Sequence, residues 1–105
     1  MAKKYEVVIT PSAQKDLNEI KSYLTNVLKT SSSSIFEKIL EQVKILKTHP
    51  FTYSVHQDSL LKLIGYRVIP IGNYLMFYVV KSNVVQIHRI LYAKRNYLRL
   101  LGMDN

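Results

Sequence analysis

The sequence has no cysteine and no tryptophan, and it has only three glycines and three prolines in 105 residues. Without cysteine the chain can form neither a disulfide nor a thiolate zinc site. Gly65, Gly72 and Gly102 are too far apart to build a phosphate-binding loop. The apolar runs are short, as in residues 74–80, and fall well below the ~20 residues that span a bilayer. These absences exclude a disulfide scaffold, a P-loop enzyme and a transmembrane helix.

Metal, cofactor and export signals are also missing. His49, His56 and His88 lack the i, i+4 helical spacing of a metal site, so we expect neither a metal nor a cofactor. No charged segment followed by an apolar stretch indicates a signal peptide near the start. The expectation is therefore a cytoplasmic protein without membrane contact.

Acidic residues are absent from most of the second half. Residues 1–58 carry eight Lys or Arg against six Asp or Glu, whereas residues 59–103 carry seven Lys or Arg and no acid. A basic half beside a balanced half produces a directed field, which favours a polyanionic partner such as nucleic acid or an acidic protein. A generally basic, soluble surface is the alternative.

The hydrophobic period changes from helical to alternating about halfway along the chain. Before the change, the pattern predicts a strand over residues 3–10 and two helices, the first capped by Thr10 with Pro11 at its first position and the second bounded by Pro50. After it, the pattern predicts strands over 61–71, 74–80 and 84–92, with turns at 72–73 and 81–83, and a short helical tail over 94–101. The first helix has an apolar stripe at Ala13, Leu17, Ile20, Leu24, Val27 and Leu28, and the second at Ile35, Phe36, Ile39, Leu40, Val43 and Leu46; residues 30–34 can cap the second.

This order predicts one α+β domain over residues 1–105, with the layout β-α-α-β-β-β. We expect a mostly antiparallel four-stranded sheet with the first strand at an edge and the nearly all-apolar strand 74–80 in a central position. A helical hairpin would cover one face, and the chain would end in a short helix or tail. The other face would be partly open and basic, which offers a place for RNA or an extended acidic peptide.

The basic half lacks paired carboxylates, so any catalysis there would depend on Arg, Lys, Tyr and His. RNA cleavage fits these residue types, because a 2′-OH can attack the adjacent phosphate and the protein then positions it and stabilises its charge. Arginine suits this task because its planar fork matches phosphate oxygens.

The individual candidates each allow two interpretations. Arg67 lies in an apolar strand, and its guanidinium would either reach the open sheet face or sit on the solvated side of a half-buried strand. Arg89 shares parity with Ile87 and Leu91, which favours a structural role with a partner. His88 would titrate near neutrality, although a strand histidine is more often a surface residue.

The chain end has a similar ambiguity. Tyr92 would stack on a base, transfer a proton or simply pack at the strand end, whereas Lys94, Arg95 and Arg99 favour contact with an anion. The tyrosines at 66, 74 and 78 fit core packing better than a stacking platform.

Four stretches together resemble the RelE/ParE superfamily of bacterial toxin–antitoxin modules over nearly the whole chain. They are "VVITPSAQKDLNEI", "LKTHP", "GYRVIPIGNYLMFYVV" and "VVQIHRILYAKRNYLRLL". Each is weak alone, and their order and spacing make the resemblance specific.

The resemblance implies a small toxin held in a heteromeric complex by a cognate antitoxin with an acidic C-terminal segment. RelE-like members cleave mRNA on the ribosome without metal, whereas ParE-like members act on DNA gyrase. A degenerate, non-toxic member that only binds antitoxin is a third possibility. Of these three possibilities, a ribosome-dependent mRNA endonuclease is the function we expect.

The family pattern transfers only partly. Arg67 resembles the second-strand arginine near the scissile phosphate, Arg95 resembles the arginine after the last strand, and Tyr92 stands where many relatives have histidine. A lysine pair before the second strand is reduced to Lys62, and Leu101 stands where a terminal tyrosine is expected. The predicted catalytic residues are Arg67, Arg95, Tyr92 and His88. The predicted RNA-binding residues are Lys62, Arg89, Lys94, Tyr97 and Arg99.

Overall fold

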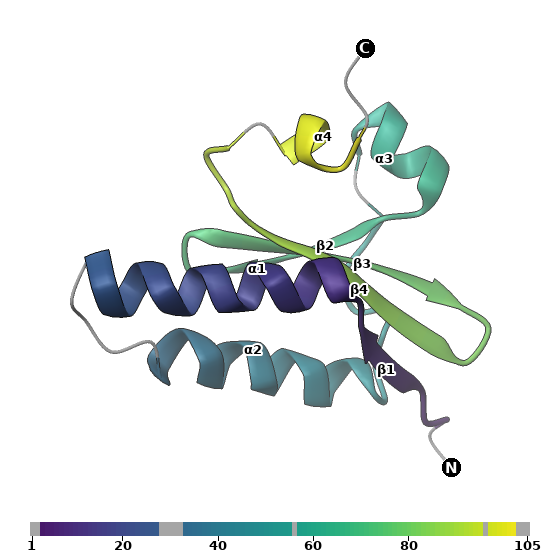
Figure 1. The fold of residues 1–105 in the computed structure, drawn as a ribbon. Helices are drawn as coiled ribbons and strands as arrows, with labels where there is room; N and C mark the ends of the chain where they lie inside the picture. The colour runs from purple at the N-terminus through teal and green to yellow at the C-terminus, as the bar shows by residue number, and fades with distance from the viewer. Residues whose placement is uncertain (1–2, 28–32, 56, 96, 103–105) are drawn as a thin grey trace.

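The computed structural model describes residues 3–27, 33–55, 57–95 and 97–102. It confirms an α+β fold in which four strands form one sheet between two layers of helices (Figure 1). The elements in chain order are β1 (Glu6–Ile9), α1 (Pro11–Ser22), a π-helical segment η1 (Tyr23–Val27), α2 (Ser33–Leu46), α3 (Ser59–Ile64), β2 (Arg67–Ile71), β3 (Tyr74–Lys81), β4 (Val84–Tyr92) and α4 (Tyr97–Leu100).

The sheet order is β1-β4-β3-β2, with β1 parallel to β4 and the other pairs antiparallel. The prediction that the first strand lies at an edge is confirmed, as is the central position of the apolar strand β3. Gly72 adopts a positive φ of 57° in the β2–β3 turn, and a Cβ there would lie 3.3 Å from Ile35 Cδ1 on α2. Glycine at this turn therefore serves both the backbone conformation and the close approach of the helix.

Helices α1 and α2 cover one face of the sheet, as the helical periodicity predicted (Figure 1). Thr10 caps α1, because its Oγ1 accepts the Ala13 N–H at 3.3 Å and donates to the His88 carbonyl at 3.1 Å. The core of this face contains Ala13 and Ile20 from α1, Ile39 and Leu46 from α2, and Ile69, Ile71, Met76, Tyr78, Val85, Ile87 and Ile90 from the sheet.

The two helical stripes are not buried throughout. Leu40 is 60% exposed and Val27 is 62% exposed, so the prediction that they face the core was wrong. Leu28 and most of the proposed cap at residues 30–34 lie outside the described residues.

The opposite face is covered by α3 and α4 (Figure 1), so the expectation of a partly open face was wrong there. A second core lies between these short helices and the sheet, and Leu61 on α3 and Phe77 on β3 are completely buried in it. Tyr66, Val79 and Leu91 complete its buried part, and Tyr97, Leu100 and Leu101 pack against it from the C-terminal end.

The strand predicted over residues 61–71 begins only at Arg67, because residues 59–64 form α3. The segment "LLKLI" has apolar residues at both helical and alternating spacing, so its period could not decide between the two. Gly65, with a φ of 84°, ends the helix and turns the chain into β2. In the described part of the chain, no helix combines the length and hydropathy needed to cross a membrane.

Candidate functional site

A buried ion pair joins α1 to β4. Asp16 is 5% exposed, and its carboxylate accepts hydrogen bonds from Arg89 Nε at 2.7 Å and Nη2 at 2.9 Å, and from the Ile90 N–H at 3.0 Å. Arg89 Nη1 also donates to the Leu100 carbonyl at 2.8 Å, so one guanidinium connects α1, β4 and the end of α4. The Asp16 hydrogen bond is the main cause that raises the pKa of Arg89, and burial opposes it. The guanidinium is therefore engaged on all three nitrogens.

Asp16 was not among the residues predicted from the sequence to have a functional or structural role. Asp16 lies three residues after Ala13 and four before Ile20, and all three are buried on the same side of α1. A carboxylate on an apolar helical stripe needs a buried cationic or hydrogen-bonding partner. That signal was present in the sequence.

A β-bulge in β4 decides where His88 and Arg89 point. Phe77 pairs with Arg89 and Tyr78 pairs with Ile87, so His88 is the extra residue on β4. Ile87 faces the α1–α2 core, whereas Leu91 belongs to the α3–α4 core. The predicted shared parity of Ile87, Arg89 and Leu91 was therefore wrong, although the expectation that Arg89 has a partner is met by Asp16.

His88 is held between two side chains. Its Nδ1 lies 2.8 Å from the Tyr66 hydroxyl, and its Nε2 lies 3.1 Å from Gln86 Oε1. Gln86 Oε1 can only accept, so Nε2 carries the proton and Tyr66 donates to Nδ1. Burial lowers the pKa of His88, and nearby Lys81 lowers it further, which keeps the imidazole neutral at pH 7.

His88 and Arg89 line a small depression, the histidine cavity, of about 330 Å³. Its wall also includes Thr10, Ser12, Tyr66, Leu100 and Leu101. Burial raises the pKa of Tyr66, and Arg89 opposes the rise. A phenol with a raised pKa stays protonated and is a hydrogen-bond donor here, not a nucleophile.

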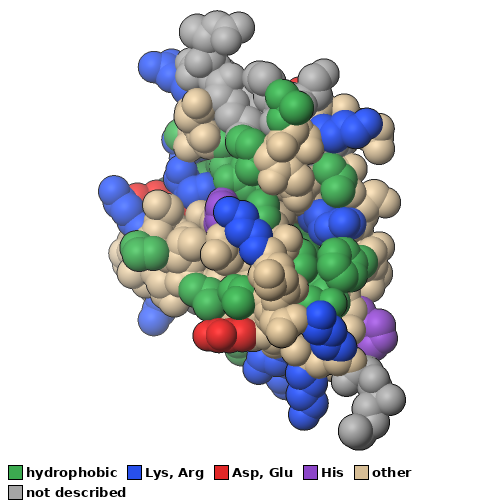
Figure 2. Space-filling view, turned by 90° about the vertical axis from the view of Figure 1, so that its right-hand side faces the viewer, with side chains coloured by type: hydrophobic (Ala, Val, Ile, Leu, Met, Phe, Trp, Pro, Cys, Tyr) green, Lys and Arg blue, Asp and Glu red, His purple; other side chains and the backbone are tan. Residues whose placement is uncertain are grey.

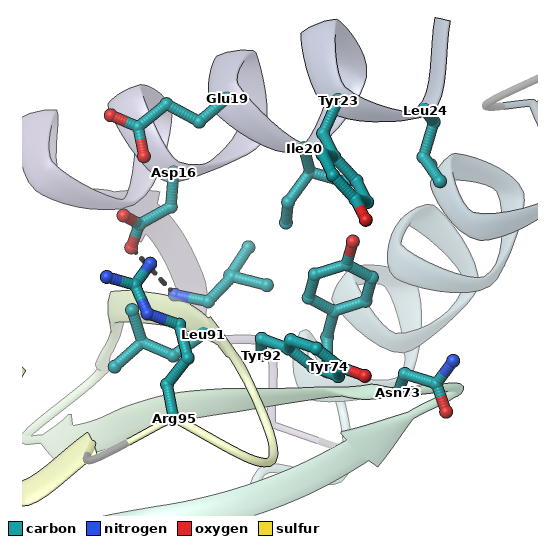
Figure 3. Close-up of a pocket in the computed structure, with 11 residues that line it drawn as sticks. Asp16, Glu19, Ile20, Tyr23, Leu24, Asn73, Tyr74, Leu91, Tyr92 and Arg95 are labelled. Atoms are coloured by element: carbon teal, nitrogen blue, oxygen red, sulfur yellow. Dashed lines mark hydrogen bonds between the residues drawn. The ribbon is translucent and has the colours of Figure 1, made fainter. Parts of the chain in front are cut away.

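A larger cavity of about 550 Å³ lies between α1, η1 and the far end of the sheet (Figure 3). We call it the tyrosine cavity, because three tyrosines line it: Tyr23 on η1, Tyr74 on β3 and Tyr92 on β4. The rings of Tyr74 and Tyr92 are 5.9 Å apart, and Figure 3 shows the Tyr23 and Tyr74 hydroxyls pointing toward each other. Burial raises the pKa of Tyr74, and Tyr23 and Tyr92 raise it further.

Arg95 lies at the opposite wall of the tyrosine cavity. In Figure 3 its guanidinium points toward the side of α1 that carries Asp16 and Glu19. Within the described ranges, the Arg95 side chain has no ion pair. The tyrosine cavity therefore combines an apolar interior with one exposed, uncommitted cation.

Arg67 lies at the other end of the sheet and faces α2, on the same side as Ile69 and Ile71. Its Nη1 donates to the Tyr53 carbonyl at 2.6 Å, and its guanidinium lies over the Phe51 ring at 4.9 Å. Arg67 therefore holds the segment that follows α2 against the sheet.

The other predicted RNA-binding residues are spread over the α3–α4 side. Lys62 is exposed on α3, Lys94 is exposed after β4, and Arg99 is exposed on α4. Tyr97 is half-buried, with its ring 5.5 Å from that of Phe77.

The structure thus brings Tyr92 and Arg95 together in one cavity and His88 and Arg89 in another, while Arg67 lies apart from both. Arg67 pairs with Tyr78 and Tyr92 pairs with Tyr74, four residues earlier on β3. At about 3.3 Å per residue and about 4.8 Å per strand, they are separated by about 13 Å along the sheet and about 10 Å across it. The described part of the chain has no group of three His, Cys, Asp or Glu side chains that could hold a metal ion.

A family model supplies the decisive comparison. The model of the ParE toxin of type II toxin–antitoxin systems matches residues 7–97. The chain belongs to this ParE toxin family. The match runs from Val7 on β1 to Tyr97 at the start of α4, and it includes the Asp16–Arg89 pair and every residue that lines the tyrosine cavity. Leu100 and Leu101 of the histidine cavity lie beyond it. No curated protein sequence matches the toxin.

Solved structures with the same fold come from several toxin–antitoxin systems. The toxin is 20% identical to a chain of the chromosomal ParDE system from P. aeruginosa, with a TM-score of 0.67, and the match covers 87% of this chain and 98% of that chain. A chain of the E. coli DinJ–YafQ complex matches at 12% identity and TM-score 0.58, covering 85% and 92%. A chain of the Staphylococcus aureus YoeB–YefM complex matches at 18% and 0.56, covering 85% and 97%. At these identities the likeness shows the fold alone.

Proposed function

We propose that this toxin acts by binding DNA gyrase, as the ParE-like branch of the superfamily implies, and not by cleaving mRNA. The observation that carries the proposal is the separation of the candidate catalytic residues. The family match to ParE toxins supports the same choice.

Charge stabilisation at one phosphate requires that its cationic groups reach the same few ångströms. Arg67 and Arg95 do not meet this requirement, because they lie at opposite ends of the sheet and Arg67 is turned toward Tyr53. Arg89 is closer to His88, yet its guanidinium is occupied by Asp16 and the Leu100 carbonyl. This arrangement supports a protein that acts through its surface.

Proton transfer meets a similar obstacle. Both ring nitrogens of His88 are engaged, by Tyr66 and by Gln86, so a substrate proton would have to displace one of them. Tyr92 is 40% exposed and accessible to a substrate. The cation that lines the tyrosine cavity with it is a single arginine, Arg95. Of the four predicted catalytic residues, Tyr92 and Arg95 line the tyrosine cavity while Arg67 and His88 lie outside it, so a single predicted cation would stabilise a phosphate there.

To test this proposal, the toxin is expressed in cells beside three variants that each lack one predicted catalytic side chain: Arg95→Ala, Tyr92→Phe and His88→Gln. We expect all four proteins to arrest growth, to induce double-strand breaks and filamentation, and to leave message ends unchanged. Glu37→Gln, an exposed position on α2 outside both cavities, is the matched surface control. Message cleavage that disappears in any of the three variants would contradict the proposal.

A ribosome-dependent nuclease is the second candidate, and one observation favours it. Tyr92 and Arg95 line the same cavity, so a phenol and an uncommitted guanidinium lie beside a space of about 550 Å³. In that case mapped message ends in translating cells would appear with wild type and be lost in both Arg95→Ala and Tyr92→Phe, with supercoiling unaffected.

We also propose that the toxin is held by an acidic antitoxin in a heteromeric complex. The acid-free residues 59–103 support this partner, and so does the structural similarity to chains of the DinJ–YafQ and YoeB–YefM toxin–antitoxin complexes. We expect an adjacent reading frame with an acidic C-terminal half whose product co-purifies with the toxin and restores growth. A neighbouring frame whose product neither binds nor restores growth would count against this partner.

A further inference from the structure

A second group of cations lies at the end of the sheet where β1 begins and β3 turns into β4, which is the end opposite the tyrosine cavity. Figure 2 views the molecule from this side, and Lys and Arg side chains outnumber acidic ones on the face that it shows. We call this surface the Phe51 patch. Its residues are Lys3, Lys4, Lys47, Arg67 and Lys81 with the aromatic rings of Tyr5 and Phe51.

Backbone hydrogen bonds bring these distant segments together. The Tyr5 N–H donates to the Lys47 carbonyl at 2.8 Å, which fixes the start of the chain to the end of α2. The Glu6 N–H donates to the Asn83 carbonyl at 2.9 Å, which adds the β3–β4 turn that follows Lys81. Four separate stretches of sequence therefore contribute cations to this end of the sheet.

The aromatic residues are interleaved with these cations. The Tyr5 and Phe51 rings meet edge to face at 6.1 Å, Lys3 Nζ lies 5.3 Å from the centre of the Tyr5 ring, and Arg67 Cζ lies 4.9 Å from that of Phe51. Phe51 remains 56% exposed despite these neighbours, so its ring is accessible to a ligand. Exposed rings set among cations are the arrangement that binds single-stranded nucleic acid, because bases stack on the rings while the cations contact phosphates.

The charge at this end is strongly one-sided. Five Lys or Arg side chains belong to the patch, and Glu6 on β1 is the carboxylate beside them. Among the described residues, the Arg67 guanidinium donates one hydrogen bond to a carbonyl, from Nη1 to Tyr53. Its other N–H groups are therefore available to an anion.

We propose that the Phe51 patch binds single-stranded nucleic acid, with Phe51 stacking on a base and Lys3, Lys47, Arg67 and Lys81 contacting phosphates. This binding is independent of whether the toxin acts on gyrase or on the ribosome. Arg67, predicted from the sequence as a catalytic residue, belongs to this patch. The residues predicted to bind RNA are not part of it: Lys62, Arg89, Lys94, Tyr97 and Arg99.

The test measures fluorescence anisotropy of the full chain with labelled oligothymidylate and oligouridylate of about twelve nucleotides, within the range that small binding surfaces cover. Four phosphate contacts on a single strand predict a slope of about −2.8 for log K against log salt, or about a 50-fold loss of affinity between about 50 and about 200 mM. Equal affinity for the two strands indicates backbone and stacking recognition, and a preference for one identifies DNA or RNA as the ligand; both outcomes support the patch.

Two variants separate the cations from the ring. Lys3→Gln/Lys47→Gln/Lys81→Gln should reduce the slope to about −0.7, because one contact remains. The matched control, Lys15→Gln/Lys21→Gln/Lys38→Gln, makes the same change of charge on exposed positions of α1 and α2 and should keep most of the slope.

Phe51→Ala should weaken binding by about fivefold or more through loss of stacking while the slope is unchanged. Leu40→Ala, another exposed apolar residue, should have no effect. Thermal unfolding confirms that each variant is folded.

Three results would overturn the proposal: no binding at low salt, equal losses in the patch and control triple variants, or indifference to Phe51→Ala. Polyglutamate serves as a competitor for the alternative of an acidic protein partner. If polyglutamate binds as tightly as the oligonucleotides and with the same salt slope, the surface is a docking site for an acidic protein and the nucleic-acid proposal is wrong.

Discussion

Replacing Asp16 by Asn tests the contact that joins α1, β4 and α4. The side chain keeps its shape, but the carboxylate that accepts two hydrogen bonds from Arg89 and one from the Ile90 N–H loses its charge. Removing one member of a buried ion pair costs about 3–5 kcal/mol, because the other charge is left without compensation. The Arg89 side chain is 25% exposed, so water offsets part of this cost and we expect a loss of about 2–3 kcal/mol.

The assay is urea unfolding at neutral pH, with stability taken from the midpoint at constant slope. Glu37→Gln removes a carboxylate from an exposed position on α2 and should change stability by less than about 0.5 kcal/mol. Arg89→Met and the double variant Asp16→Asn/Arg89→Met complete a cycle. We expect the double variant to be more stable than the sum of the single losses predicts, by about 1–3 kcal/mol.

The reasoning would be refuted by an Asp16→Asn protein that is as stable as Glu37→Gln, or by single losses that are additive in the cycle. Either outcome would mean that Asp16 and Arg89 contribute independently. The account of α4 as an element anchored through Arg89 would then lose its basis.

Three further predictions concern other parts of the fold. Burial lowers the pKa of His88 below 6.5, so the unfolded state binds more protons and stability should fall as the pH drops below about 6.5; His88→Gln should flatten this part of a stability–pH curve, and an unchanged curve would contradict it. Leu61 is completely buried and Leu63 is 84% exposed on the same helix, so by denaturant unfolding Leu61→Ala should cost about 2–5 kcal/mol and Leu63→Ala less than about 0.5 kcal/mol; equal effects would mean that α3 does not pack as described. Burial raises the pKa of Tyr78 to about 12, and its hydroxyl donates to the buried Pro50 carbonyl at 2.7 Å. Tyr78→Phe should therefore lower the free energy of unfolding by about 1–3 kcal/mol and remove a phenol that ionises only near pH 12 in an ultraviolet titration. A variant of wild-type stability would contradict the hydrogen bond.

Periodicity predicted the elements that bury a long, regular apolar face. Strand β3 is apolar at nearly every position and lies centrally, and the stripe of α1 is buried at Ala13 and Ile20. These segments are long enough for one period to dominate. Helix α3 has six residues, and its identity depends on packing of Leu61 against Phe77 and not on its local pattern.

The site was less predictable because its contacts connect residues that are far apart in sequence. Arg89 and Asp16 are separated by 73 positions, and local patterning carries no information on such pairings. The bulge at His88 reverses the side-chain alternation in the middle of β4, so a period-two reading fails beyond it. Arg67 could not be placed because its partner, the Tyr53 carbonyl, belongs to an irregular segment.

The central claim is that the toxin acts on DNA gyrase through its surface. The most direct measurement adds purified toxin to gyrase and relaxed plasmid with ATP, and follows supercoiling as the toxin is increased to saturation. The account predicts that supercoiling is inhibited by wild type and equally by Arg95→Ala and His88→Gln. Supercoiling that is unchanged at saturating toxin, together with new message ends in translating cells that vanish with Arg95→Ala, would contradict it.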